Sequence, residues 1–166
     1  FGYDAFREGQ QEIIEAVLSG QDTLALLPTG MGKSLCYQLP GYVVEGTILV
    51  ISPLLSLMQD QVEQLRQFGE KRVAALNSFL SFDDKQFVWQ HFDAFRFLFL
   101  SPEMLASDAV KMRLQQMKLG LIVVYEAHCI SQWGFDFRPE YLQIAEALPK
   151  ERPPILALSA TATKQI

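Results

Sequence analysis

Short apolar runs alternate along the chain with longer stretches in which apolar residues recur at helical spacing. The apolar runs predict β-strands, and because most are continuous, they are typical of parallel strands covered by helices on both faces. The stretches between them predict helices. This order of elements favours an α/β fold with a mainly parallel central sheet and helices on both faces. The expected strands are Thr23–Leu27, Thr47–Ser52, Arg72–Leu76, Phe97–Ser101, Leu121–Tyr125 and Ile155–Ser159.

Three of the intervening stretches carry an apolar helical face. The first face consists of Ile13, Ile14, Val17 and Leu18, the second of Leu54, Leu57, Met58, Val62 and Leu65, and the third of Tyr141, Leu142, Ala145 and Leu148. Pro139 precedes the third face, and a proline is favourable in the first turn of a helix. A further packed helix face is indicated by Trp89, His91, Phe92 and Phe95, to which we assign no function.

Length and composition indicate one globular domain. The chain has 166 residues, enough for a single sizeable core and too few for two ordinary ones. Hydrophobic residues make up 49% and charged residues 20%, a balance that argues against disorder. The apolar runs are too short to span a bilayer and the start of the chain lacks a signal-peptide pattern, so we expect a soluble intracellular protein with no membrane partner.

Charge and cysteine content narrow the possible partners and metals. The net charge of -5 and the pI of about 5.0 provide no overall basic footprint for nucleic acid, so any such contact must be local. Cys36 and Cys129 lie far apart and without a nearby histidine cluster. We therefore expect reduced, partly buried thiols rather than a disulfide or a zinc site.

Small or polar residues follow several of the expected strands and precede helices. The segments concerned are LPTGMGKS, ISPLLS, LSPEM, YEAHC and LSATAT. Ligands of open α/β sheets gather at the carboxyl ends of the strands, so we expect these junctions to share one edge of the sheet.

The segment LPTGMGKS, from Leu27 to Ser34, has the composition and context of a phosphate-binding loop. Gly30 and Gly32 allow the tight turn that points backbone N–H groups at phosphate oxygens. Lys33 is expected to reach the β and γ phosphates of a nucleotide, and the Ser34 hydroxyl to ligate Mg²⁺. Leu27 replaces the first glycine of the usual GxxxxGK[ST] pattern, and a glycine-rich turn without a ligand is the alternative interpretation.

Together, these junctions resemble the ordered motifs of superfamily 2 helicases, and most closely those of the RecQ family of DNA helicases. TGMGKSLCYQLP is similar to motif I, SPLLSLMQDQ to motif Ia, FLSPE to motif Ib, YEAHCISQWG to motif II and LSATAT to motif III. The resemblance covers nearly the whole chain. It implies one RecA-like ATP-binding domain over residues 1–166, with ATP and Mg²⁺ as cofactors and DNA, single-stranded and at duplex junctions, as partner.

The resemblance also implies which residues bind the nucleotide. FGYDAFREGQQEII is similar to the RecQ motif that holds adenine, with Tyr3 stacking on the base and Arg7 and Gln10 hydrogen-bonding it. Glu126 would position or activate the attacking water, so Lys33 and Glu126 are the expected catalytic residues. The phosphate-loop residues are Thr29, Gly30, Met31, Gly32, Lys33 and Ser34.

An aromatic tract is expected to couple DNA to the nucleotide site. SQWGFDFRPEY brings together Trp133, Phe135, Phe137 and Arg138, and aromatic faces with a cation suit a single strand. From the residues alone, a hydrophobic cluster under a surface loop is the favoured interpretation. The resemblance favours the RecQ loop that senses single-stranded DNA, although RecQ proteins usually carry histidine where this chain has Phe135.

Residues of the other motifs complete the coupling set. By the resemblance, Ser52, Gln59 and Ser101 touch the DNA backbone through hydroxyl and amide groups, which suits sequence-independent binding. Ser159 and Thr161 link the nucleotide site to DNA, whereas from the residues alone they would be a capping pair.

Helicases of this type hydrolyse ATP between two RecA-like domains, the second of which supplies an arginine finger. The chain stops soon after motif III, so we expect this second domain of the full-length chain to be absent. His128 would reach it, although a lone histidine is more often structural. Loss of such a finger costs about 10³ to 10⁵ in rate, so we expect the isolated chain to hydrolyse ATP very slowly and not to unwind DNA, whereas the full-length protein would move 3′ to 5′ along DNA.

Motif II departs from the family pattern at one position. The family carries Asp-Glu-Ala-His, and this chain has Tyr125 where the aspartate would hold Mg²⁺ through its water shell. A phenol with a pKa of about 10 is neutral at pH 7 and replaces a hard oxygen anion poorly. The alternatives to a working motor domain are therefore a hydrolysis-deficient nucleotide- or DNA-binding module and, from the phosphate loop alone, an unrelated P-loop kinase or NTPase.

The resemblance implies a cytoplasmic, nucleoid-associated location in a bacterium and a nuclear one in a eukaryote.

Overall fold

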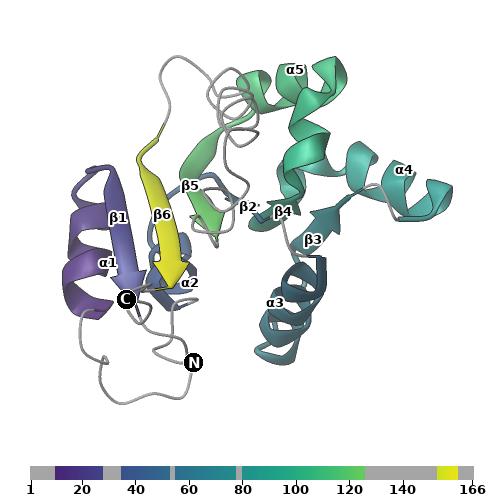
Figure 1. Ribbon diagram of the computed structural model, residues 1–166. Coiled ribbons are helices and arrows are strands. Elements are labelled where there is room, and N and C mark those ends of the chain that lie inside the picture. Colours follow the sequence, from purple (N-terminus) through teal and green to yellow (C-terminus); the bar gives the residue numbers. More distant parts are fainter. Residues whose placement is uncertain (1–9, 28–34, 53–54, 78–79, 126–152, 161–166) are drawn as a thin grey trace.

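The computed structural model describes residues 10–27, 35–52, 55–77, 80–125 and 153–160. Within these ranges, one six-stranded sheet with the order β1-β6-β5-β2-β4-β3 forms the centre of the molecule (Figure 1). All of its pairings are parallel, which confirms the predicted α/β class. The strands are β1 (Thr23–Leu27), β2 (Thr47–Ile51), β3 (Val73–Leu76), β4 (Phe97–Leu100), β5 (Leu119–Tyr125) and β6 (Ile155–Ala160).

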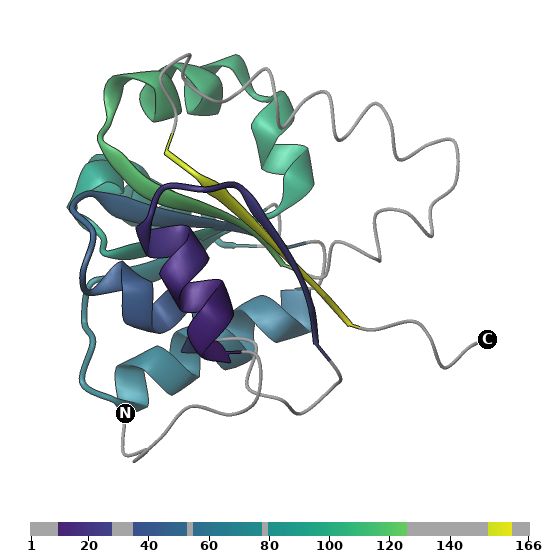
Figure 2. The same ribbon diagram turned by 90° about the vertical axis from the view of Figure 1, so that its left-hand side faces the viewer.

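Helices cover both faces of this sheet. The described α-helices are α1 (Gln10–Leu18), α2 (Leu35–Gly41), α3 (Leu55–Gln67), α4 (Phe82–Gln90) and α5 (Asp108–Gln116), and two short 3-10 helices are η1 (Phe92–Ala94) and η2 (Pro102–Ala106). Figures 1 and 2 show α1, α2 and α3 on one face, and α4 and α5 on the other. None of the described helices is long and apolar enough to cross a membrane.

Each face of the sheet has its own hydrophobic core. Ile48 and Val50 of β2 pack with residues of α1, α2 and α3, whereas Leu49 and Ile51 pack with residues of α4, η2 and α5. All four side chains are fully buried. Because successive side chains of a strand point to opposite faces, burial on both sides explains why the strand sequences are continuous apolar runs.

The predicted strands are confirmed with small shifts at their ends, of which the start of β5 is the largest. Leu119 already pairs with Thr47, and the register shifts between Thr47 and Ile48. The turn before β2 lies directly against the start of β5, since a Cβ on Gly120 would collide with the Glu45 carbonyl oxygen. A glycine soon after Lys118 is typical of a loop, but here it permits this close approach of two backbones.

Two predictions about helix faces need correction. Leu18 was expected on the buried face of the first helix, but it is 42% exposed, and Ile14 and Val17 form the buried part. The predicted aromatic helix face from Trp89 to Phe95 is wrong, because α4 ends at Gln90. Its C-cap, His91, is exposed, and the chain then turns through η1 so that Phe92 and Phe95 enter the core from outside the helix.

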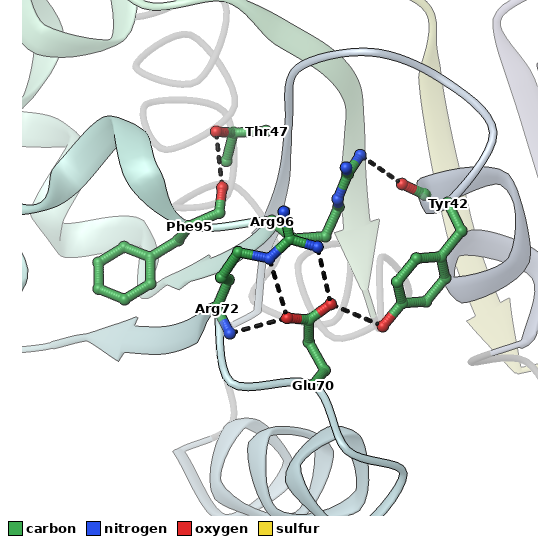
Figure 3. A network of polar contacts seen from close by, with 7 residues as sticks. Tyr42, Thr47, Glu70, Arg72, Phe95 and Arg96 are labelled. Atoms are coloured by element: carbon green, nitrogen blue, oxygen red, sulfur yellow. Dashed lines mark hydrogen bonds and ion pairs between the residues drawn. The ribbon is translucent and has the colours of Figure 1, made fainter.

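A polar network ties the connections together at the amino-terminal edge of the sheet (Figure 3). The Glu70 carboxylate is 7% exposed and accepts hydrogen bonds from the Tyr42 hydroxyl at 2.9 Å and the Arg72 backbone N–H at 2.8 Å. Burial by itself raises the pKa of Glu70, but these bonds and the Arg72 guanidinium outweigh it and hold the pKa below 4.5. Burial and the bond to Glu70 raise the pKa of Tyr42 to about 12.

Candidate nucleotide and nucleic-acid site

The carboxyl ends of β1, β6 and β5 lie side by side at one edge of the sheet. Leu26 of β1 is in register with Ser159 of β6, and Tyr125 of β5 is in register with Leu158. Neighbouring strands lie about 4.8 Å apart, so the ends of β1 and β5 are separated by about 10 Å. Segments 28–34 and 126–152 therefore begin close together, at a separation that one nucleotide could bridge.

A strand and a helix bracket the predicted phosphate loop, which confirms the context expected for it. β1 ends at Leu27 and α2 begins at Leu35. Two residues of α2, Cys36 and Tyr37, are fully buried against the sheet. Burial raises the pKa of the Cys36 thiol to about 11, so the thiol is protonated at neutral pH. It is free, as predicted, but fully rather than partly buried, and Cys129 lies outside the described residues.

Position 125 lies at the same edge of the sheet as the strand end that precedes the predicted phosphate loop. Tyr125 is the last residue of β5, and the residues that end the neighbouring strands are Leu27 and Ala160. No carboxylate therefore stands at the described ends of these three strands. Mg²⁺ is held in such sites by carboxylate and phosphate oxygens, so the residues at these three strand ends supply no carboxylate ligand for it.

Ser52 and Ser101 follow β2 and β4 at the same edge, next to one another in the sheet. The Ser52 N–H donates to the Leu100 carbonyl at 3.0 Å, and the Ser101 N–H donates to the Leu76 carbonyl at 3.3 Å. Both residues are 1% exposed. The Ser101 hydroxyl has no hydrogen-bond partner among the described residues, which is an unusual state for a buried polar group. Their contact with DNA stays a prediction.

Two glutamines of the predicted site lie apart from each other. Gln10 is the first residue of α1 and is 2% exposed, so its amide is already enclosed by the protein. Gln59 is exposed on α3 and lines a groove beside β3. The structure thus brings Ser52 and Ser101 together and leaves Gln59 on a neighbouring surface.

The remaining predicted site residues lie outside the described part of the chain or have only their backbone described. The former are Tyr3, Arg7, Thr29, Gly30, Met31, Gly32, Lys33, Ser34, Glu126, His128, Trp133, Phe135, Phe137, Arg138 and Thr161, and the latter are Tyr125 and Ser159.

A buried polar contact between α2 and α3 was missed in the sequence. The Tyr37 hydroxyl donates to Gln61 Oε1 at 2.6 Å, and Gln38 Nε2 lies 3.4 Å from the same oxygen. Gln61 is 8% exposed and stands on the buried face of α3, among Met58, Val62 and Leu65. The available signal was the spacing of Gln61, three residues after Met58 and four before Leu65, which puts an amide inside an apolar helical stripe.

Comparison with known proteins points to one family. The model of the DEAD/DEAH box helicase family matches residues 7–166. The chain is 57% identical over 166 residues to the probable ATP-dependent DNA helicase RecS of Bacillus subtilis, covering 99% of this chain and 34% of that protein. It is 46% identical over 167 residues to the ATP-dependent DNA helicase RecQ of Pasteurella multocida, covering 98% and 26%. It is 41% identical over 177 residues to the ATP-dependent DNA helicase Q5 of Rattus norvegicus, covering 100% and 18%. The chain thus spans about a third or less of the length of these relatives.

Proposed function

Because the chain belongs to the DEAD/DEAH box helicase family, we propose that it is the ATP-binding motor domain of a RecQ-type 3′ to 5′ DNA helicase. Its similarity to RecS and RecQ proteins extends over nearly the whole chain, in agreement with the resemblance predicted from the motifs. The full-length protein would couple ATP hydrolysis to DNA unwinding. The second RecA-like domain of that protein would supply the arginine finger.

One observation carries this proposal: the strand order places β6 between β1 and β5 at the shared edge. This order puts the start of the phosphate-loop segment two strand spacings from Tyr125, the residue before Glu126. In that arrangement, Lys33 would neutralise charge on the transferring phosphoryl group, and Glu126 would position the attacking water. The residues proposed to hold adenine are Tyr3, Arg7 and Gln10, and those proposed to surround the phosphates are Thr29 to Ser34.

DNA would cross the same edge. Ser52 and Ser101 supply hydroxyl groups there, and the unpartnered Ser101 hydroxyl could bond a phosphate oxygen after a small local shift. Coupling to the nucleotide would run through the aromatic tract, with Ser159 and Thr161, and His128 would face the second motor domain. The tract consists of Trp133, Phe135, Phe137 and Arg138.

Tyr125 favours a second candidate function, a nucleotide- and DNA-binding module that hydrolyses ATP poorly. Position 125 ends β5 at the nucleotide edge, where the family has an aspartate. A neutral phenol there leaves Ser34 as the protein's direct oxygen ligand for Mg²⁺. Nucleotide binding would persist, and its dependence on Mg²⁺ would be weak.

Substitution at position 125 separates the two functions. We expect Tyr125→Asp to make the affinity of the 166-residue chain for ATP depend clearly on Mg²⁺, and to raise ATP turnover in the full-length protein. Tyr125→Asn, which is also smaller than tyrosine but neutral, should do neither. Affinity is measured by calorimetric titration of ATP with Mg²⁺ and with a chelator. If the original chain already binds ATP much more tightly with Mg²⁺ and the full-length protein turns over rapidly, Tyr125 does not impair the metal site. If ATP does not bind under any condition, the proposed motor domain is wrong.

A further inference from the structure

The outer edge of β3 faces a groove between α3 and α4. β3 is the last strand at one side of the sheet, and Figure 1 shows α3 and α4 flanking it. The groove has a volume of about 760 Å³ and is lined by β3, by both helices and by Lys71 before the strand. It lies at the opposite side of the sheet from β1, so it is separate from the proposed nucleotide site.

The backbone of β3 offers hydrogen-bonding groups to this groove. The Arg72 carbonyl accepts from the Phe97 N–H at 3.2 Å, and the Leu76 carbonyl accepts from the Ser101 N–H at 3.3 Å, so these residues face β4. Because residues alternate along a strand, the N–H and C=O groups of Val73 and Ala75 point the other way. Within the described ranges, no hydrogen bond satisfies these outward groups. Ala75 is partly exposed, so its donor and acceptor are available on the groove side, whereas those of the buried Val73 lie beneath the surface of the groove.

How far β3 lies below the surfaces of α3 and α4 determines which kind of strand could pair with it. Val73 is 2% exposed and Ala74 is 6% exposed, so the strand lies recessed between its flanking helices. An unpaired edge is a template for another strand. The recessed edge of a second copy could not reach it, because α3 and α4 of the two copies would collide first. A single extended segment could enter.

The walls of the groove carry opposite charges at their two ends. α3 starts after β2 and ends before β3, so Asp60 lies nearer the carboxyl ends of the strands and Arg66 nearer their amino ends. Asp84 in the first turn of α4 is close to the end of β3, and Lys71 is close to its start. Glu63 adds a carboxylate between the two ends. The groove is therefore acidic where β3 ends and basic where it begins.

We propose that this groove binds an extended segment of a partner protein as an added strand, antiparallel to β3. Antiparallel pairing is slightly more stable per residue than parallel pairing. In this direction, the charges of the groove select a segment that is basic at its amino end and acidic at its carboxyl end. Phe87, which lines the groove and is 58% exposed, supplies an apolar contact for one side chain of the segment. Backbone bonds hold the segment, and the end charges set its direction.

The first test uses synthetic peptides and the 166-residue chain. A fluorescent peptide Lys-Lys-Thr-Val-Thr-Val-Glu-Glu with blocked ends is titrated and followed by anisotropy. We expect it to bind about tenfold more tightly than Lys-Glu-Thr-Val-Thr-Val-Lys-Glu, which has the same composition without the polarity, since four end charges contribute up to about 1.4 kcal/mol together. Equal binding of the two peptides would overturn the proposal, and tighter binding of Glu-Glu-Thr-Val-Thr-Val-Lys-Lys would overturn the antiparallel direction.

Backbone pairing is tested separately from charge. Ala75→Pro removes an outward N–H and is tolerable on an edge strand, so it should abolish peptide binding and leave the chain folded. If it unfolds the chain, N-methylation of alternate peptide residues in the two possible registers replaces it, and one register should abolish binding while the other does not. On binding, the amides of Val73 and Ala75 should become protected from hydrogen exchange. Protection elsewhere, or a dimer in sedimentation that Ala75→Pro disrupts, would refute the assigned occupant.

The charge pattern is tested by reversing it. The quadruple variant Asp60→Lys, Arg66→Glu, Lys71→Glu and Asp84→Lys exchanges the two ends of the groove at exposed positions. It should bind the peptide that is acidic at its amino end about tenfold more tightly than the peptide that is basic there, which is the reverse of the original preference. An unchanged preference would show that the groove charges do not select the ligand.

Discussion

The Tyr37 hydroxyl donates a 2.6 Å hydrogen bond to Gln61 Oε1 and thereby joins two helices that follow different motifs. Tyr37 lies on α2, directly after the phosphate-loop segment, and Gln61 lies on α3, two residues after Gln59. Both side chains are buried. A short bond in a low-dielectric core resists separation, so we expect a shift of α2 to move the helix that carries a proposed DNA contact.

Removing this acceptor should destabilise the chain. Gln61→Leu leaves the buried Tyr37 hydroxyl without the Gln61 oxygen, and we expect a loss of about 1–3 kcal/mol in the free energy of unfolding. Tyr37→Phe should cost a similar amount. The double variant should cost less than the sum of the two, with a coupling of about 0.5–3 kcal/mol. Urea unfolding monitored by circular dichroism measures all three, and strictly additive losses would show that the bond contributes nothing.

Stability should depend on pH through Glu70. Because its pKa in the folded state lies below the ordinary 4.5, the bonds to Tyr42 and Arg72 contribute fully above about pH 4.5 and are lost as the pH falls through the lowered pKa. Glu70→Gln should therefore cost about 1–2 kcal/mol at pH 7, and the difference from the original chain should shrink in acid.

A matched control for this acid dependence is Glu45→Gln. Glu45 pairs with Lys118 at 2.8 Å, and that bond also lowers its pKa, but the pair is exposed to solvent. Screening by water should make the effect of Glu45→Gln much smaller than that of Glu70→Gln. Thermal unfolding from pH 3 to pH 8 compares them, and equal shifts for both variants would contradict a special role of burial at Glu70.

Gly120→Ala should be costly although its backbone conformation is ordinary. The added methyl would lie closer to the Glu45 carbonyl oxygen than real Cβ atoms approach, and 3.0 Å from Val44 Cγ2. The turn cannot easily retreat, because the Thr47 N–H donates to the Lys118 carbonyl at 3.0 Å. We expect a loss of about 3 kcal/mol in the free energy of unfolding.

Gly69→Ala separates collision from backbone strain. Gly69 has a φ of 96° and no atom within 4 Å of an added Cβ, so its substitution costs only the left-handed conformation, about 1–2 kcal/mol. The denaturant midpoint of Gly120→Ala should therefore be lower than that of Gly69→Ala. A milder effect at Gly120 than at Gly69 would mean that the turn over β5 adapts to the methyl.

The strands could be predicted because burial on both faces of the sheet requires a continuous run of apolar residues, which is visible in the local sequence. After its first residue, Thr47, the run TILVI in β2 is entirely apolar, and the ends of such runs are marked by small or polar residues. The start of β5 could not be found in this way, because a glycine is required at position 120 by the close approach of the distant Glu45 backbone. Gln61 was missed for the same reason, since its acceptor role depends on Tyr37, which is 24 positions away in the chain.

The candidate site was predictable to a smaller degree. The motif order indicated that the strand ends share one edge, and the pairing of β1, β6 and β5 confirms it. The burial of Ser52 and Ser101 was not visible, because a serine after a strand has the same sequence appearance whether it lies on the surface or beneath it. Long-range packing decides that difference.

The strand order also has a consequence for biosynthesis. Among the described strands, β1 pairs with β6 alone, and β6 is the last of these strands to leave the ribosome. At about 5–20 residues per second, β1 waits several seconds for the partner that docks it into the sheet. Until then, the strand that precedes the predicted phosphate loop has no neighbouring strand to pair with. The proposed nucleotide site can therefore assemble only after β6 has been synthesised, so we expect a nascent chain that is interrupted before residue 155 to be unable to capture ATP.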